Sequence, residues 1–262
     1  ELVGGLDVRQ LAGKPVLVGQ KKTPGVIGTK PIHFTSDDEH SKPIPLESLR
    51  IDLGGEAVEK AKIGDRATFA TSFERVSPSL RGKALDNRIG VATLIELVKN
   101  PPLNIELLAA FTVQEEVGLR GAKVASYALN PDLAIVLDCT PANDLPMWDD
   151  SENTRYNTRL GAGPAVYVAD AGTVSDPRLV RYLLRTAESY GIPCQIRQPG
   201  GGGTVAGAIH RQRQGIPSVS LSVPARYTHT AVSLCRVGDW ESTLKLLFAA
   251  LQNINRSVLE RA

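Results

Sequence analysis

The pattern of hydrophobic and polar positions divides the chain into two parts of different character. From Glu1 to about Leu80, glycine and proline are frequent, helical periodicity is weak, and short apolar runs alternate with turn signals. Such runs, bounded by turn residues, are typical of strands. They predict strands at 16–18, 26–27, 49–53 and 67–73. We therefore expect residues 1–80 to form a small β-domain.

After Gly82 the pattern changes to alternating helices and strands. Apolar residues at Val91, Leu94, Ile95 and Val98 have helical spacing, and they predict a helix over 87–99. Further helices are expected at 121–129, 177–190, 206–209 and 240–253, and strands at 107–113, 133–137, 195–196 and 218–222. This alternation predicts that residues 81–262 form an α/β domain, a three-layer α/β/α sandwich around a mostly parallel sheet.

The apolar run 107–113 is interpreted as a buried central strand that leads directly into Glu115 and Glu116. Open α/β sheets bind ligands beyond the carboxyl ends of their strands, so the chemistry is expected here. Neighbouring side chains on an extended backbone point in different directions. One carboxylate could therefore bind a metal ion while the other acts as a base. The alternative is that both are solvated loop glutamates.

Three more titratable residues lie at predicted element ends. Asp86 directly precedes the helix 87–99, Asp138 ends the strand 133–137, and His229 follows the strand 218–222. Each also has an ordinary interpretation: a helix cap for Asp86, a polar strand end for Asp138 and a structural loop histidine for His229. A parallel sheet would bring all three to one rim together with Glu115 and Glu116.

Five titratable groups in one crevice require a cation. Carboxylates and imidazole without thiolates suit Zn²⁺, Co²⁺ or Mn²⁺, and one bridging carboxylate can hold two such ions. Two ions lower the pKa of a shared water molecule, and a free carboxylate can accept its proton. The group therefore indicates hydrolysis assisted by two divalent cations, with Zn²⁺ or Co²⁺ favoured.

Composition and charge narrow the choice of partners and setting. The net charge of +2 offers no strong field for nucleic acid or an anionic membrane, and no apolar stretch is long enough to span a bilayer. Cys139, Cys194 and Cys235 are odd in number and far apart. They predict neither disulfides nor a thiolate zinc cluster, which favours a reducing, cytoplasmic setting.

Five motifs together resemble the M42 family of dinuclear metallo-aminopeptidases, which includes the tetrahedral (TET) and glutamyl aminopeptidases. They are Lys83-Ala-Leu-Asp-Asn-Arg88, Gln114-Glu-Glu-Val-Gly-Leu-Arg-Gly121, the strand ending at Asp138, Gly200-Gly-Gly-Gly-Thr204 and Arg226-Tyr-Thr-His229. The N-terminal part is similar to the small β-barrel domain that these enzymes insert into their catalytic domain.

The resemblance implies a role for each of the five residues. Asp86 would bridge both metal ions, Glu116 and His229 would complete one metal site, and Asp138 would belong to the other. Glu115 would be the general base. The family cleaves amino-terminal residues from peptides, so peptide substrates are expected. It also implies a homo-oligomer, up to the twelve-subunit tetrahedral particle in which the β-barrel domains help assembly.

The chain departs from the family pattern at two places. A His-x-Asp motif upstream of the barrel is absent, although in the family its histidine shares a metal ion with the residue equivalent to Asp138. We expect the chain to be a fragment of a longer protein; the alternative is a shortened member with an impaired metal site. Val205 stands where the family usually has aspartate, which affects a contact around the metal or the substrate.

The sequence also allows other functional interpretations, each with a feature that distinguishes it. Gly201-x-Gly203-x-x-Ala206 fits a dinucleotide fingerprint formally, but it lies late in the chain and lacks the following acidic residue. A nucleophilic pair of Cys235 and His229 is less favoured than a buried inert thiol. Within hydrolases a metal-dependent N-acyl-amino-acid deacylase is the alternative. From another class, the chain could be a catalytically silent assembly subunit.

Overall fold

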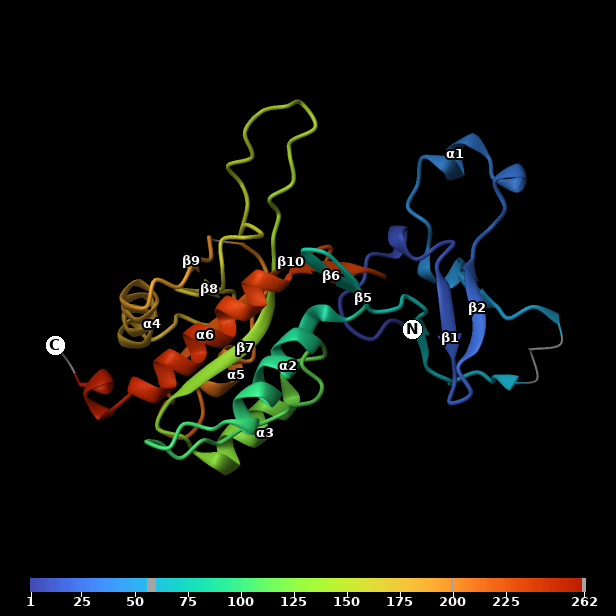
Figure 1. Ribbon diagram of the computed structural model, residues 1–262. Helices are drawn as coiled ribbons and strands as arrows, with labels where there is room; N and C mark the ends of the chain where they lie inside the picture. Colours follow the sequence, from blue (N-terminus) through green and yellow to red (C-terminus); the bar gives the residue numbers. More distant parts are fainter. Residues whose placement is uncertain (56–59, 199, 261–262) are drawn as a thin grey trace.

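The computed structural model has a large α/β part and a smaller β part beside it (Figure 1). It describes residues 1–55, 60–198 and 200–260. The smaller part holds the strands numbered β1 to β4, and the chain then enters the larger part near β5. The mixed α/β character expected from the alternating pattern is confirmed.

The small part is built on one antiparallel sheet in the order β3-β2-β1-β4. Its strands are β1 (Pro15–Val18), β2 (Thr23–Gly28), β3 (Arg50–Asp52) and β4 (Ala67–Phe69). All four predicted strands are confirmed. The described residues form an open sheet instead of the expected closed barrel, because β3 and β4 remain at opposite edges.

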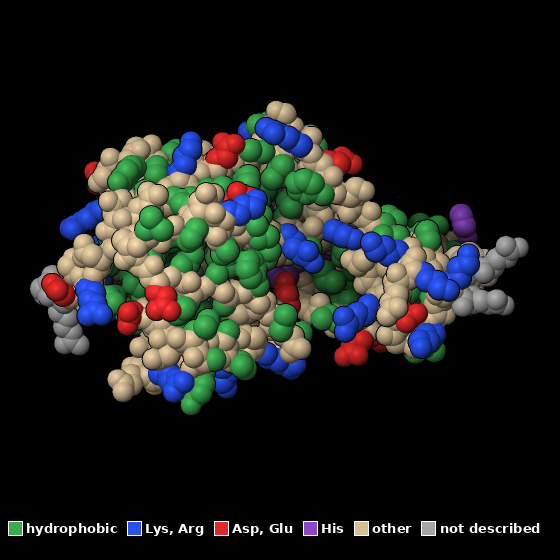
Figure 2. Space-filling model, turned by 60° about the horizontal axis from the view of Figure 1, so that its bottom comes forward, with side chains coloured by type: hydrophobic (Ala, Val, Ile, Leu, Met, Phe, Trp, Pro, Cys, Tyr) green, Lys and Arg blue, Asp and Glu red, His purple; other side chains and the backbone are tan. Residues whose placement is uncertain are grey.

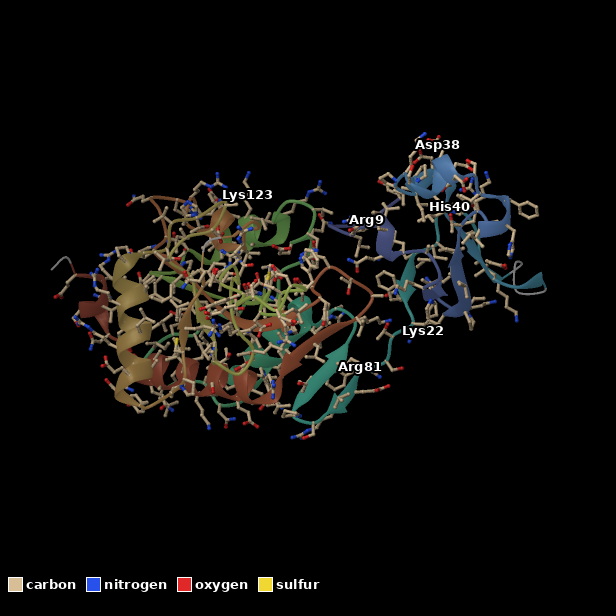
Figure 3. All side chains as sticks on the ribbon, turned by 90° about the horizontal axis from the view of Figure 1, so that it is seen from above. Arg9, Lys22, Asp38, His40, Arg81 and Lys123 are labelled. Atoms are coloured by element: carbon tan, nitrogen blue, oxygen red, sulfur yellow. The ribbon has the colours of Figure 1, made fainter. Side chains whose placement is uncertain are left out.

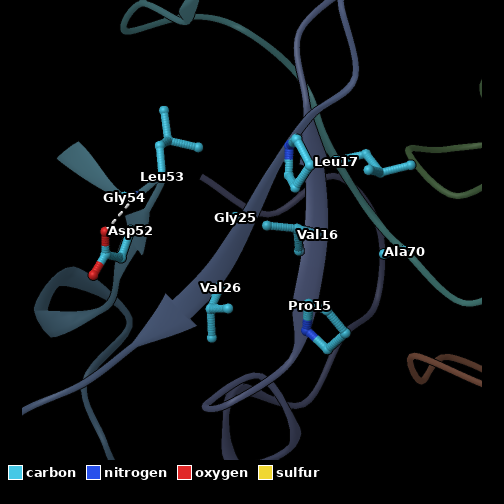
Figure 4. A pocket seen from close by; sticks show the side chains of 10 residues that line it. Pro15, Val16, Leu17, Gly25, Val26, Asp52, Leu53, Gly54 and Ala70 are labelled. Atoms are coloured by element: carbon cyan, nitrogen blue, oxygen red, sulfur yellow. Dashed lines mark hydrogen bonds between the residues drawn. The ribbon is translucent and has the colours of Figure 1, made fainter. Parts of the chain in front are cut away.

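A shallow apolar hollow lies on this small sheet and is lined mainly by β1, β2 and the turn after β3 (Figure 4). Val26 is 47% exposed there, and the Gly54 N–H donates a hydrogen bond to Asp52 Oδ1 at 2.8 Å. The helix α1 (Asp37–His40) lies on the same part, where Figure 3 places Asp38 and His40 away from the larger part. The small part therefore presents an apolar surface of its own.

The large part contains a seven-stranded mixed sheet. Its strands are β5 (Glu74–Val76), β6 (Ser79–Gly82), β7 (Ala134–Pro141), β8 (Ala165–Val166), β9 (Gln195–Ile196), β10 (Ser218–Arg226) and β11 (Ser233–Arg236). The order is β5-β6-β11-β10-β8-β9, with β7 also paired to β10. Among the described strands of this sheet, only the β7–β10 and β8–β9 pairs are parallel; the other pairs are antiparallel.

The expectation of a mostly parallel sheet is therefore wrong. The strands β5, β6, β8 and β11 were not anticipated from the sequence, and they supply the antiparallel pairs. β8 has only two residues and β5 only three, too few for an alternating apolar pattern to be recognised. Predicted strands that became β7, β9 and β10 are confirmed.

Strand alternation gives the large sheet one apolar and one polar face near β10. Val219 and Leu221 point into the main hydrophobic cluster, whereas Ser220 and Ser222 lie on the opposite face. The helices α2 (Leu85–Lys99), α4 (Pro177–Ser189) and α6 (Val237–Asn253) contribute to this cluster. α5 (Ala206–Ile209) contacts β7 and β10, and α3 (Arg120–Leu129) packs on α5. The expected helices are confirmed; the three-layer arrangement stays a prediction.

The run 107–113, expected as a central strand, has no strand pairing in the described structure. Leu107 packs against the main cluster, but Leu108, Phe111 and Val113 are 39%, 54% and 67% exposed. An extended segment becomes a strand only when its backbone groups pair with a neighbour. None of the described strands pairs with this run, so its apolar sequence alone was not sufficient.

Leu221 offers a direct test of the core. Its side chain is fully buried in β10 between Leu137 and Val166. Leu221→Ala is expected to lower the free energy of unfolding by about 2–5 kcal/mol, because it removes buried methyl groups and leaves a cavity. Ile63→Ala, at a fully exposed position, should change it by less than about 0.5 kcal/mol. Urea denaturation of both variants measures the difference; equal effects would contradict the burial described.

Candidate metal site

Asp86 lies at the start of α2, where the backbone has not yet become helical. Asp86 and Asn87 have non-helical dihedral angles, and the preceding Ala84 has φ of +52°. Asn87 Nδ2 donates to the Leu137 carbonyl at 2.8 Å, and Asn87 Oδ1 accepts from Gly90 N at 3.1 Å. Asn87 therefore accepts a hydrogen bond from an N–H group of the first helical turn and also connects this turn to β7. Asp86 is left free of the capping role that was its alternative interpretation.

Glu115 and Glu116 lie in a tight turn between the run 107–113 and α3. The N–H groups of Gly118 and Leu119 both donate to the Glu115 carbonyl, at 3.1 and 2.9 Å. The turn closes where Gly121 approaches Val113 so closely that a Cβ would lie 2.5 Å from the Val113 carbonyl oxygen. Glu115 is half-buried, whereas the Glu116 side chain is 43% exposed. The two neighbours therefore have different environments.

Asp138 occupies the interior of β7, three residues before the end of the strand. It pairs with Ser222 of β10, and only 8% of its surface is exposed. The Cys139 N–H donates to Asp138 Oδ1 at 2.8 Å. The expected position at a strand end is wrong, because β7 continues to Pro141 alongside β10.

His229 stands in the turn between β10 and β11, with φ of +60°. Its Nε2 lies 3.7 Å from Asp86 Oδ2, and its Nδ1 lies 3.7 Å from Glu116 Oε2. Nδ1 also lies 2.8 Å from the Gly5 carbonyl oxygen. In Figure 2 a histidine and an acidic side chain are visible together in a hollow between the larger and the smaller part.

The structure brings three of the five predicted residues into one group. Asp86, Glu116 and His229 each offer one ligand atom, and these atoms lie within 4.8 Å of one another. Asp138 and Glu115 lie outside this group, but the charge of Asp86 raises the pKa of both carboxyl groups. Among the described residues this is the group found with metal-ligand spacing, and His229 is its only histidine.

Burial and repulsion from neighbouring carboxylates raise the pKa values of Asp86, Glu115 and Asp138. Burial raises the pKa of Asp86 to about 6; nearby His229 opposes the shift and Glu116 adds to it. Burial also raises the pKa of Glu115, with further contributions from Glu116 and Asp86. The pKa of Asp138 is raised well above its usual range, mainly by burial and then by Asp86. Carboxylates at such a spacing need a positive charge to stay ionised.

A divalent cation fits the chemistry of this donor set. Two carboxylate oxygens and one imidazole nitrogen are hard to borderline ligands that bind Zn²⁺ or Co²⁺, and no thiol belongs to the group. The three cysteines are free, as the sequence predicts. Cys139 and Cys235 are buried, and burial raises the pKa of both thiols. They are therefore unsuited to act as nucleophiles.

Sequence reasoning missed two contributors to the site. Asn87 anchors the start of α2 through its hydrogen bond to the Leu137 carbonyl. In the sequence, only its position next to the candidate ligand Asp86 could have indicated this role. Gly5 contacts both Glu116 and His229, across 111 and 224 residues of sequence. No local sequence pattern can predict contacts between residues so far apart in the chain.

The chain is similar to known aminopeptidases in both sequence and structure. A glutamyl aminopeptidase from Lactococcus lactis is 33% identical over 246 residues, which cover 90% of this chain and 67% of that protein. The structure of a TET aminopeptidase from a marine sediment thaumarchaeon matches with a TM-score of 0.88 and 32% identity, covering 98% of this chain and 75% of that one. These relatives are aminopeptidases, which are hydrolases.

The TET1 peptidase of Pyrococcus horikoshii, described as assembling into a tetrahedron or a large octahedral shell, matches with a TM-score of 0.79 and 34% identity. The match covers 96% of this chain and 76% of that one. The profile of the M42 glutamyl aminopeptidase family matches residues 1–246. The chain belongs to this family, and the resemblance seen in its motifs is confirmed.

The raised pKa of Asp86 predicts how stability depends on pH in metal-free protein. The pKa of Asp86 is about 6 in the folded state and 3.8 ordinarily, so between these values the folded state binds more protons. Folding stability should therefore fall as pH rises from about 4 to 6, and Asp86→Asn should reduce this fall by about 1–3 kcal/mol.

Urea denaturation at several pH values with a chelator present measures the effect. Asp149→Asn is the control, because hydrogen bonding by Ser151 lowers the pKa of the exposed Asp149. Because its pKa is lowered on folding, Asp149 can only make stability rise with pH, and it is mostly ionised in both states over this range. An identical pH dependence in wild type and Asp86→Asn would contradict the prediction.

Proposed function

We propose that the chain is an aminopeptidase that removes N-terminal residues from peptides with the help of two divalent cations, Zn²⁺ or Co²⁺. The observation that carries the proposal is the grouping of Asp86, Glu116 and His229 within 4.8 Å, in a chain that belongs to the M42 family. When bound, the cations would act as Lewis acids and lower the pKa of a water molecule.

In this proposal Asp86 would be the carboxylate shared by both ions, as the resemblance to the family implies, and it belongs to the group with metal-ligand spacing. It faces Nε2 of His229, and it interacts electrostatically with Glu116 and Asp138. Glu116 and His229 complete the first ion site, and Asp138 belongs to the second. Asp138 is held in position by the β7–β10 ladder and by the Cys139 N–H.

Glu115 is the proposed general base. It lies beside the ligand group without belonging to it, so its carboxylate remains available for proton transfer. Its pKa is raised by burial and by the neighbouring carboxylates. A base with a raised pKa holds a proton more readily, and the same group can then protonate the leaving amine.

We propose a homo-oligomer, up to the tetrahedral dodecamer, in which the small β-domain (residues 1–80) makes subunit contacts and residues 81–262 form the catalytic domain. The exposed apolar hollow around Val26 supports such contacts.

Of the described helices, none combines the length and hydrophobicity needed to cross a membrane. We propose a cytoplasmic location, because the three cysteines are free, as is usual in a reducing compartment.

The proposed roles predict different effects for two substitutions. Glu115→Gln should lower kcat by about 10²–10⁴-fold, because the base is lost, while metal binding is retained. Asp86→Ala should lose both bound ions, because it removes the bridging ligand. Hydrolysis of aminoacyl-p-nitroanilides, together with elemental analysis of dialysed protein, separates the two outcomes. Near-normal turnover by Glu115→Gln would show that another group is the base.

A substrate panel distinguishes the peptidase from the alternatives. Aminoacyl amides and N-acyl-amino acids are offered to the protein with added Zn²⁺ or Co²⁺, and a chelator serves as the negative control. Preference for the N-acyl set would replace the peptidase proposal by a deacylase. Less than about one bound ion per chain, with no turnover in metal-supplemented buffer, would support a silent assembly subunit, because a complete metal site should retain its ions.

A further inference from the structure

The first residues of the chain lie directly against the candidate metal ligands. Gly5 N–H donates a long hydrogen bond of 3.5 Å to Glu116 Oε2, and the Gly5 carbonyl oxygen lies 2.8 Å from His229 Nδ1. One peptide segment thus offers a donor to the carboxylate and an acceptor to the imidazole. Nothing in the roles assigned to Asp86, Glu115, Glu116, Asp138 and His229 uses this segment.

The contact with His229 determines which ring nitrogen can bind a cation. A carbonyl oxygen has no proton to give, so Nδ1 must carry the hydrogen in this hydrogen bond. The neutral ring then has its lone pair on Nε2, the nitrogen that faces Asp86 Oδ2 at 3.7 Å. This separation leaves room for a cation bonded to both atoms at about 2.0–2.2 Å.

We propose that the Gly4-Gly5 main chain is a positioning element of the metal site, which fixes His229 in the Nδ1–H tautomer with Nε2 directed toward the cation. The proposal rests on the proposed function for the identity of the site. Histidine ligands generally donate their second ring N–H to a carbonyl or a carboxylate, which fixes the orientation of the ring. Here the Gly5 carbonyl has that position.

The alternative is coordination through Nδ1, which lies 3.7 Å from Glu116 Oε2. It would require Nδ1 to lose its proton and the 2.8 Å contact with Gly5 to become a repulsion between two lone pairs. The hydrogen bond therefore favours Nε2. The same contact also keeps the ring from turning away, although the His229 side chain is 46% exposed.

Both glycines are needed because of their close approach to the ligands. Gly4 has φ of +91°, and a Cβ there would lie 3.0 Å from both Cβ and Oε2 of Glu116. A Cβ on Gly5 would lie 3.3 Å from His229 Nδ1. An added methyl group at either position must therefore displace a candidate ligand or the segment itself.

Nitrogen NMR on metal-free protein tests the tautomer directly. In ¹⁵N-histidine-labelled protein near neutral pH, two-bond ¹H–¹⁵N correlations distinguish the Nδ1–H from the Nε2–H form. The His229 signal, assigned by its loss in His229→Gln, is expected in the Nδ1–H form. His210, whose Nδ1 lies 2.8 Å from the Ala206 carbonyl oxygen, is the internal reference. An Nε2–H tautomer at His229 would overturn the proposal.

Zn²⁺ affinity, measured by competition with a chromophoric chelator, tests the positioning role. Gly4→Ala and Gly5→Ala are expected to weaken binding by about 10–100-fold, the usual effect of losing a group that orients a ligand. Gly13→Ala is the control for Gly4, because Gly13 has φ of +75° with open space around it. Gly55→Ala, also in open space, is the control for Gly5. Both controls should retain wild-type affinity, while circular dichroism and urea denaturation check the fold of all four.

The results separate this inference from the proposed function. Wild-type protein that binds no Zn²⁺ contradicts the metal-dependent function, whereas the His229 tautomer still tests the role of Gly5. Wild-type binding with unchanged affinity in Gly4→Ala and Gly5→Ala leaves the function intact and overturns the positioning role. A loss of affinity in Gly13→Ala equal to that in Gly4→Ala would overturn it too, because backbone strain alone would then explain the effect.

Discussion

The crowding of acidic side chains around one imidazole is the constraint on which the rest of the structure depends. Asp86 and Glu116 are held with His229 within 4.8 Å, and Glu115 and Asp138 add further negative charge nearby. Burial raises the pKa of Asp86 to about 6, so in the absence of a cation the group resists full ionisation. Folding must therefore supply enough favourable packing elsewhere to hold these side chains together.

The large sheet supplies that packing on one face and a polar surface on the other. Val219 and Leu221 anchor β10 in the hydrophobic cluster. On the opposite face, the Tyr167 hydroxyl donates to Thr140 Oγ1 at 2.9 Å, and Thr204 and Ser220 share a hydrogen bond of 2.7 Å. The side chain of Asp138 lies on this buried polar face. The same β10 that fills the core leads through its following turn to His229, so packing and site geometry have a common support.

Segments from the whole length of the chain converge on the site. The N-terminal residues contact Glu116 and His229, the start of α2 brings Asp86, and the turn after β10 brings His229. The proposed role of Gly5 follows from this convergence, because a main-chain carbonyl can orient the imidazole without adding another charge. The small β part follows directly on this segment and lies beside the large part (Figure 1), which places it at the edge of the candidate site.

Sequence alone determined the alternation of elements, the helices from α2 to α6, the four strands of the small sheet and the identity of the candidate ligands. Periodicity and local motifs carry this information because they depend on near neighbours. Tertiary structure decided that run 107–113 pairs with none of the described strands, that the large sheet is mostly antiparallel, and that Asp138 lies inside β7. It also decided that Asp86, Glu116 and His229 form the tighter group and that Gly5 touches two of them. Strand partners and contacts across more than 100 residues depend on which segments meet in space, and no local pattern records that.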